Sequence, residues 1–167
     1  MVINMYKILP LLTVLFLVAA CETTTPDPAG QLMSISDLGE NPGYSWYQTE
    51  IASYTPDASM VDSIVRNFQS ADEKVCIFVR PSCGCRGTQR LFPQIMKTLI
   101  AAKVDMSKIE IWSMRNPSDK TPYSSTLKLT TLPSIVVTKN GVELARIVDA
   151  DYNEVNADTL IANAVNP

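Results

Sequence analysis

The stretch that decides the fold is TLPSIVVTKNGVELARIV, residues 131–148. Two β-rich runs, SIVVT and VELARIV, lie on either side of a Lys-Asn-Gly turn. Asn140 and Gly141 supply the positive φ angles that a tight hairpin turn requires, so the stretch predicts a strand, a turn and a second strand. A closing helix is predicted at residues 160–165, where apolar side chains recur at helical spacing.

The chain before this hairpin alternates between helical and strand patterns. Apolar spacing predicts a helix after Asp57, a buried strand at 75–80, a helix at 88–103 kinked at Pro93, a strand at 109–114 and a short helix ending near Lys128. A weak signal indicates a short strand at 47–54. We therefore expect an α/β fold whose mixed central sheet carries helices on both faces, with a C-terminal β-hairpin plus helix.

The first residues are typical of a targeting segment. Residues 1–20 contain one Lys, then an apolar run that ends in small residues directly before Cys21. This order is that of a secretory signal, and the apolar run is short for a membrane span. Residues 21–33 are rich in Thr and Pro and predict an extended linker, residues 34–56 form an extension with no assigned role, and residues 57–167 form the main domain.

The tetrapeptide Val18-Ala19-Ala20-Cys21 resembles the lipobox of bacterial lipoproteins. The resemblance implies that Cys21 carries lipid such as palmitate, becomes the mature amino terminus and anchors the protein to a membrane. The protein would then lie in the bacterial cell envelope, facing the periplasm or the exterior. Val18 stands where that family more often has Leu, so ordinary secretion with a free Cys21, or an uncleaved anchor, remain alternatives.

Composition excludes several kinds of chemistry. The chain has four Cys and no His, which removes catalytic pairs and metal sites built on imidazole. A formal charge of −3 argues against nucleic acid as a partner, because phosphate binding needs a basic face. Export would allow paired Cys to be oxidised and to exchange disulfides. Cys76, inside an apolar strand, is interpreted as a small buried core residue.

An apolar strand, a Cys-containing loop and a proline-kinked helix, followed by TLPSIVVTKNG, resemble the thioredoxin family over about residues 57–165. The resemblance implies a thioredoxin-like fold in which Pro133 follows a cis peptide bond. It also implies that Thr131, Leu132 and Pro133 dock the extended chain of a substrate beside the thiols. From the residues alone, Pro133 could equally be a trans proline that opens a strand.

The family's Trp-Cys-Gly-Pro-Cys motif is replaced here by Ser82-Cys83-Gly84-Cys85. In the family the attacking Cys lies eight residues before the helix-kinking proline, and this count leads back from Pro93 to Cys85. Thr88 would then occupy the place of the family's second Cys. Cys83, the nearest other thiol, would resolve the mixed disulfide. The alternative register makes Cys83 the attacking residue and requires two extra residues before the proline.

Local charge favours a reactive thiolate. The charges between positions 75 and 104 are all positive, and they are Arg80, Arg86, Arg90, Lys97 and Lys103. Cations and a helix amino terminus both lower the pKa of a thiol. Arg86 and Thr88, at the predicted helix start, are therefore assigned to stabilising the thiolate. The buried acid that the family places near its thiols has no counterpart at 75–84 or in the following helix.

The leading hypothesis is a membrane-tethered thiol-disulfide oxidoreductase that acts on protein thiols or disulfides through Cys83 and Cys85. It would be a monomer that needs no cofactor and no metal. One alternative is a copper(I)-binding or metal-centre assembly protein, since two neighbouring thiolates are soft ligands. Another is a non-catalytic thioredoxin-like binding lipoprotein in which the two Cys form a static disulfide.

Overall fold

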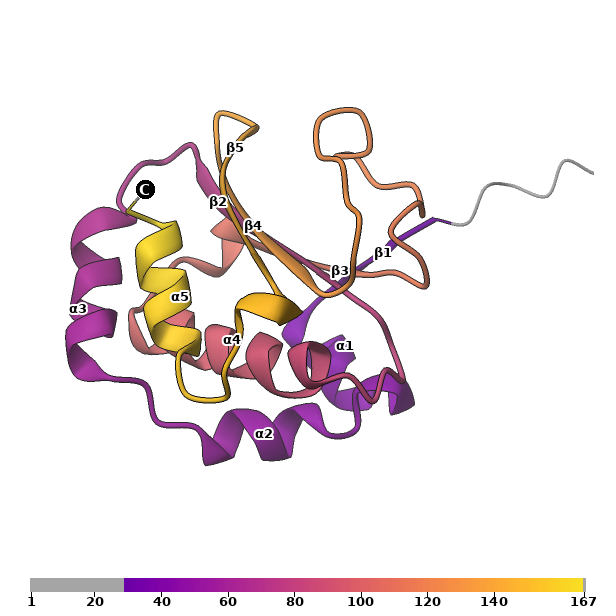
Figure 1. Cartoon of the computed structure of the whole chain (residues 1–167), viewed down its shortest axis with the longest axis horizontal. Coiled ribbons are helices and arrows are strands. Elements are labelled where there is room, and N and C mark those ends of the chain that lie inside the picture. Colours follow the sequence, from indigo (N-terminus) through magenta and orange to yellow (C-terminus); the bar gives the residue numbers. More distant parts are fainter. Residues whose placement is uncertain (1–28, 167) are drawn as a thin grey trace, which may run out of the picture.

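The computed structural model describes residues 29–166. One sheet runs through the molecule in the strand order β1-β3-β2-β4-β5 (Figure 1). The strands are β1 (Gln31–Met33), β2 (Glu73–Val79), β3 (Ile109–Ser113), β4 (Ser134–Lys139) and β5 (Val142–Val148). The central strand β2 pairs parallel with β3 and antiparallel with β4, and β1 is antiparallel to β3. The predicted mixed α/β sheet is thus confirmed.

Five α-helices and four shorter turns of helix complete the described chain. The α-helices are α1 (Ile35–Glu40), α2 (Tyr47–Ser53), α3 (Ala58–Asn67), α4 (Phe92–Ala101) and α5 (Ala157–Ala164). The shorter pieces are η1 (Pro42–Tyr44), η2 (Gly87–Leu91), η3 (Met106–Lys108) and η4 (Asp149–Asp151). None of the helices within residues 29–166 combines the length and apolar character needed to cross a membrane.

The helices pack on one face of the sheet, which corrects the expectation of helices on both faces. The main buried cluster joins residues of all five α-helices to the inward side chains of the strands. The opposite face is covered by the segment 114–132, which buries Met114 and Leu127 against Cys76 and Phe78 of β2. Figure 1 shows this segment as an orange loop on the side of the sheet away from the helices.

The segment that covers the second face contains turns where a short helix ending near Lys128 was predicted. The amide of Leu127 donates to the carbonyl of Tyr123 at 2.7 Å, yet no helix forms here. Residues 124–126 are Ser, Ser and Thr, whose side chains bond the local backbone instead of favouring a helix, as the amide of Thr121 shows by donating to Ser124 Oγ at 2.9 Å.

A polar cluster lies under this covering segment. Glu110 of β3 accepts hydrogen bonds from Lys74 Nζ at 2.7 Å, Tyr123 Oη at 2.8 Å and Trp112 Nε1 at 3.2 Å. Three donors to one carboxylate satisfy a charge that would otherwise be costly at a half-buried position. The cluster thereby fixes the covering segment to β2 and β3.

The extension at 34–56 belongs to the same core as the rest of the domain. Leu38, Tyr44 and Tyr47 are fully buried in the main cluster. The strand predicted at 47–54 is wrong, because this stretch forms α2. Tyr47, Ile51 and Tyr54 recur at spacings of four and three, so a helix brings all three to one side.

The predicted helix after Asp57 and the predicted hairpin are both confirmed. Asp57 caps α3, and its Oδ1 accepts the amide of Ser59 at 2.8 Å. Between β4 and β5, Asn140 and Gly141 have φ angles of 53° and 75°, as the turn requires. The antiparallel register pairs Ser134 with Val148, so the far end of β5 returns to the beginning of β4.

Candidate functional site

Cys83 and Cys85 form a disulfide in the loop that follows β2, with their Cα atoms 5.3 Å apart. Both residues are half-buried, so the disulfide is accessible in part to another molecule. Because β2 is the central strand, the loop leaves the middle of the sheet at the end where β3 also finishes and β4 begins. Exposed disulfides are the ones that take part in exchange.

A helix begins at the disulfide. The carbonyl of Cys85 accepts the amide of Gln89 at 3.0 Å, which makes Cys85 the residue that precedes the first helical turn. The amide of Cys85 donates to the sulfur of Cys83 at 3.2 Å. The helix dipole and this donor both favour negative charge on the sulfurs after reduction. The sequence-based placement of Cys85 at a helix start is therefore confirmed.

The first turn of that helix departs from α geometry. Gly87–Leu91 is a π-turn, and the amide of Phe92 donates to the carbonyl of Gly87. Pro93 follows at once and has no amide hydrogen to donate to the preceding turn. The irregularity that Pro93 predicts lies in this turn, directly after the cysteines.

The peptide bond between Leu132 and Pro133 is cis, as the resemblance implies. Pro133 packs on the helix start, since a Cβ added to Gly87 would lie 2.7 Å from Pro133 Cγ. Thr131 is exposed, and its carbonyl accepts the hydroxyl of Ser134 at 2.8 Å. The structure thus brings the residues at 131–133 to the helix turn that follows Cys85.

Asp149 is a residue of this site that the sequence analysis missed. A Cβ on Gly87 would lie 2.6 Å from Asp149 Oδ1, so this carboxylate touches the first turn of the helix. Its Oδ1 is buried and accepts no hydrogen bond within residues 29–166. The hairpin contained part of the signal: a turn at 140–141 alone would pair Ser134 with Ile147, and an irregularity between Val137 and Thr138 shifts the register by one residue, so that Ser134 pairs with Val148 and the next residue lies beside Pro133.

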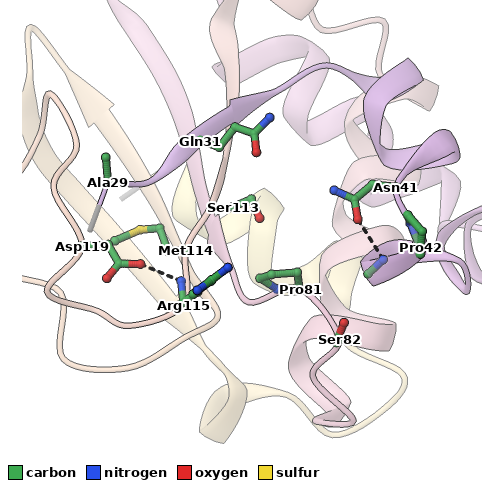
Figure 2. Close-up of a pocket in the computed structure, with 11 residues that line it drawn as sticks. Ala29, Gln31, Asn41, Pro42, Pro81, Ser82, Ser113, Met114, Arg115 and Asp119 are labelled. Atoms are coloured by element: carbon green, nitrogen blue, oxygen red, sulfur yellow. Dashed lines mark hydrogen bonds between the residues drawn. The ribbon is translucent and has the colours of Figure 1, made fainter. Parts of the chain in front are cut away.

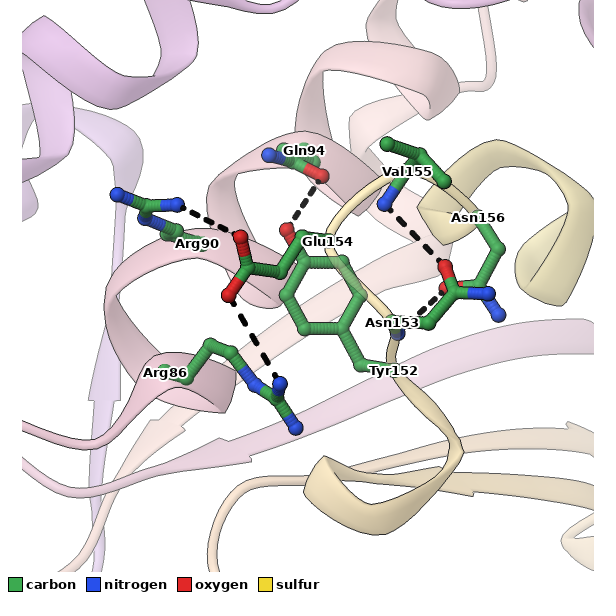
Figure 3. A network of polar contacts seen from close by, with 8 residues as sticks. All are labelled: Arg86, Arg90, Gln94, Tyr152, Asn153, Glu154, Val155 and Asn156. Carbon is green, nitrogen blue, oxygen red and sulfur yellow. Dashed lines mark hydrogen bonds and ion pairs between the residues drawn. The ribbon is translucent and has the colours of Figure 1, made fainter.

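Arg86, which the sequence assigns to stabilising the thiolate, takes part in a network of polar contacts with the loop before α5 (Figure 3). Glu154 forms an ion pair with Arg86, whose Nη1 lies 3.8 Å from Oε1, and accepts a hydrogen bond from Arg90 Nη1 at 3.3 Å. The Arg86 guanidinium also lies 5.6 Å from the centre of the Tyr152 ring. Glu154 therefore balances part of the positive charge that the sequence places around the disulfide. It lies too far along the chain for local spacing to have indicated it.

Thr88, the other residue assigned to the thiolate, is completely buried. Its hydroxyl has no hydrogen-bond partner within the described chain. A buried hydroxyl without a partner is unusual in a folded protein and costs stability. It lies in the π-turn, three residues after Cys85.

The N-terminal segment holds the cysteine loop from the other side. The amide of Ser82 donates to the carbonyl of Gly43 at 2.9 Å. A Cβ on Gly43 would lie 2.8 Å from Pro81 Cβ, so glycine permits the close approach. Ser82 has a φ of 55°, a left-handed conformation that costs energy for a residue other than glycine. The contact with Gly43 helps to hold it.

Cys76 is a buried free thiol on the face of the sheet away from the helices. Burial raises the pKa of this thiol, so it is protonated and unreactive at neutral pH. No group of three or more Cys, Asp or Glu side chains within residues 29–166 could hold a metal ion. Cys21, the predicted lipidation site, lies outside the residues that the structure describes.

Comparison with known proteins gives no match: no family model, no curated protein and no solved structure is detectably similar to this chain.

Proposed function

We propose that this protein is a thiol-disulfide oxidoreductase of thioredoxin-like fold, tethered to a membrane of the cell envelope through Cys21. The observation that carries the proposal is the partly exposed Cys83–Cys85 disulfide at the start of a helix whose first turn packs on the cis-proline Pro133. A disulfide that served stability alone would need neither the helix terminus nor the proline bend next to it.

The fold assignment has support from several elements in one order. A central strand leads into the cysteine loop and a helix, and a cis-proline later opens a strand of an antiparallel hairpin. A helix, α5, closes the described chain. Export and lipid anchoring rest on residues 1–21 of the sequence, where a secretory pattern ends at Cys21.

The reaction is an exchange of two electrons. In the oxidised protein, a substrate thiolate forms a bond with one sulfur of the pair, and the other sulfur leaves as a thiolate. A second substrate thiolate then attacks the substrate sulfur of this mixed disulfide, which releases the oxidised substrate and leaves the pair reduced. In the reverse direction, the Cys85 thiolate forms a bond with one sulfur of a substrate disulfide and the other substrate sulfur leaves as a thiolate; the Cys83 thiolate then attacks the Cys85 sulfur, which releases the second substrate thiolate and re-forms the Cys83–Cys85 disulfide. The backbone at 131–133 holds the partner's chain.

The first experiment counts thiols and measures reversibility. Purified protein that lacks residues 1–20 is equilibrated in glutathione buffers of graded reduction potential and alkylated. The proposal predicts a two-electron transition of the pair while Cys76 stays protected by burial. A pair that stays oxidised in every buffer would contradict the proposal and favour a static disulfide.

A trapping experiment then identifies the partner. Cys83→Ala leaves Cys85 without its resolving thiol, so mixed disulfides with substrates should accumulate and be visible on non-reducing gels. Cys85→Ala tests the opposite order of attack. Cys76→Ala is the matched control: it removes a fully buried thiol and leaves both Cys83 and Cys85, so any mixed disulfide is resolved and nothing should be trapped.

A further inference from the structure

A polar pocket of about 490 Å³ adjoins the cysteine loop on the side of β3 (Figure 2). One wall comes from the adjacent ends of β1 and β3 and from the segment after β3. The other wall comes from residues 41–43 and from Pro81 and Ser82, directly before Cys83. The lining includes Asn41, Gly43, Ser82, Ser113, Arg115 and Asp119. The pocket and the Pro133 bend therefore lie on opposite sides of the same loop, since β3 and β4 lie on opposite sides of β2.

The pocket offers hydrogen-bond donors that no acceptor uses. Asn41 Oδ1 accepts the amide of Gly43 at 2.8 Å, which leaves the side-chain NH2 of Asn41 without an acceptor in the described chain. Ser113 Oγ accepts the hydroxyl of Tyr44 at 2.8 Å, which leaves the hydrogen of Ser113 to donate. The lining thus carries at least two side-chain donors whose acceptor must come from outside.

Arg115 adds an unpaired charge. Its guanidinium forms no ion pair and no hydrogen bond with any residue in 29–166, and Figure 2 shows it directed toward Pro81, between the two walls. The carboxylate of Asp119 is buried, and its Oδ2 accepts the backbone amides of Arg115 at 2.7 Å and Asn116 at 3.1 Å. Because these two backbone amides already bind the Asp119 carboxylate, Arg115 is the one lining residue whose charge has no partner within residues 29–166.

We propose that this pocket binds an acidic side chain of the substrate polypeptide, close to the cysteine that exchanges with the Cys83–Cys85 pair. A carboxylate matches the unused donors of Asn41 and Ser113 and the charge of Arg115. Ser82, the residue next to Cys83, lines the pocket, so the substrate residue expected there is about two positions from the reacting cysteine, some 7 Å along an extended chain. The inference names the substrate class of the proposed oxidoreductase and rests on that function.

The test uses short peptides with one cysteine and a Glu, Gln or Lys two residues before it, with a second set in which the residue follows the cysteine. The readout is the second-order rate at which each peptide thiol reduces the Cys83–Cys85 disulfide at low ionic strength. In one of the two sets, the Glu peptide should react about twofold to fivefold faster than the Gln peptide, and the Lys peptide more slowly, as a partly exposed ion pair predicts. About 0.5 M salt should remove most of the difference.

Charge reversal separates this role from a structural one. Arg115→Glu should invert the order so that the Lys peptide reacts fastest, and Arg115→Gln should make the three rates nearly equal. Arg66→Glu, an exposed site on α3, is the matched control and should keep the wild-type order. Equal rates for Glu and Lys peptides in both sets, or an unchanged order in Arg115→Glu, would overturn the inference while leaving exchange intact. Failure of every peptide to reduce the disulfide would overturn the proposed function as well.

Discussion

Replacement of Gly87 by alanine tests whether the helix start and the Pro133 bend depend on direct contact. The added Cβ would lie 2.7 Å from Pro133 Cγ and 2.6 Å from Asp149 Oδ1. Carbon atoms pack comfortably at about 3.5 to 4.0 Å, so the helix and the bend must separate by about 1 Å. The Pro133 ring is fixed to its backbone and cannot rotate away.

The expected cost follows from two opposing effects. Overpacking of a close contact costs about 1 to 3 kcal/mol. Alanine is favoured over glycine in a helix by up to about 1 kcal/mol, which offsets part of that cost. All three nearest contacts of the added Cβ fall below 3.0 Å, so the overpacking cost lies in the upper part of that range, about 2 to 3 kcal/mol, and Gly87→Ala should lower the free energy of unfolding by about 1 to 2 kcal/mol. The measurement is urea unfolding of the oxidised protein, followed by fluorescence.

Gly84→Ala is the matched control. Gly84 lies between the two cysteines, and a Cβ there would meet nothing within 4 Å. Its unfolding free energy should stay within about 0.5 kcal/mol of wild type, as for other substitutions at open positions. If Gly87→Ala were as stable as wild type or more stable, the close contact between Gly87 and Pro133 would be refuted.

Three further predictions concern other parts of the molecule. Burial by itself raises the pKa of Glu110, but the hydrogen bonds donated to this carboxylate lower the pKa overall. The free energy of unfolding should therefore fall as the pH drops below about 4.3, the pKa of Glu in an unfolded chain. In urea unfolding, Glu110→Gln should show a weaker dependence of this free energy on pH than wild type in that range. The same pH dependence in both proteins would contradict this prediction. Lys103 lies two residues after the end of α4 and has a φ of 56°, so Lys103→Gly should raise the unfolding free energy by about 0.5 kcal/mol, and a thermal midpoint lower than wild type would argue against it. Iodoacetamide should label Cys76 only after denaturation; labelling of the native protein would show that this thiol is not buried.

Local patterns predicted the elements whose apolar side chains repeat regularly. The helix after Asp57, the strand β2 and the hairpin β4–β5 were predicted because each satisfies its own spacing and turn chemistry. α2 was missed because its apolar residues are few and include aromatic residues that also favour strands. The covering of one sheet face by the loop 114–132 could not be predicted from the sequence. This loop is mostly polar, and no local pattern indicates where its few apolar residues pack.

The candidate site was predicted where its residues are neighbours in sequence or belong to a recognised motif. Cys83, Cys85 and the cis bond at Pro133 belong to that class. Glu154 and Gly43 do not, because each reaches the cysteine loop only through the packing of the whole chain. Asp149 is intermediate, since the hairpin turn brings its segment to Pro133 but the irregularity between Val137 and Thr138 sets the register that places Asp149 there.

The cysteine loop is held between segments that lie far apart in the sequence. Gly43 binds the amide of Ser82 before the cysteines, and Pro133 packs on the helix turn after them. The Ser82 amide is released only when the segment at Gly43 detaches, and that segment is anchored by Tyr44 and Tyr47 in the main buried cluster, so opening on this side should be coupled to the unfolding of the N-terminal helices. Deuterium uptake at the Ser82 amide should then be slower than at surface amides without a partner, although the loop itself lies at the surface.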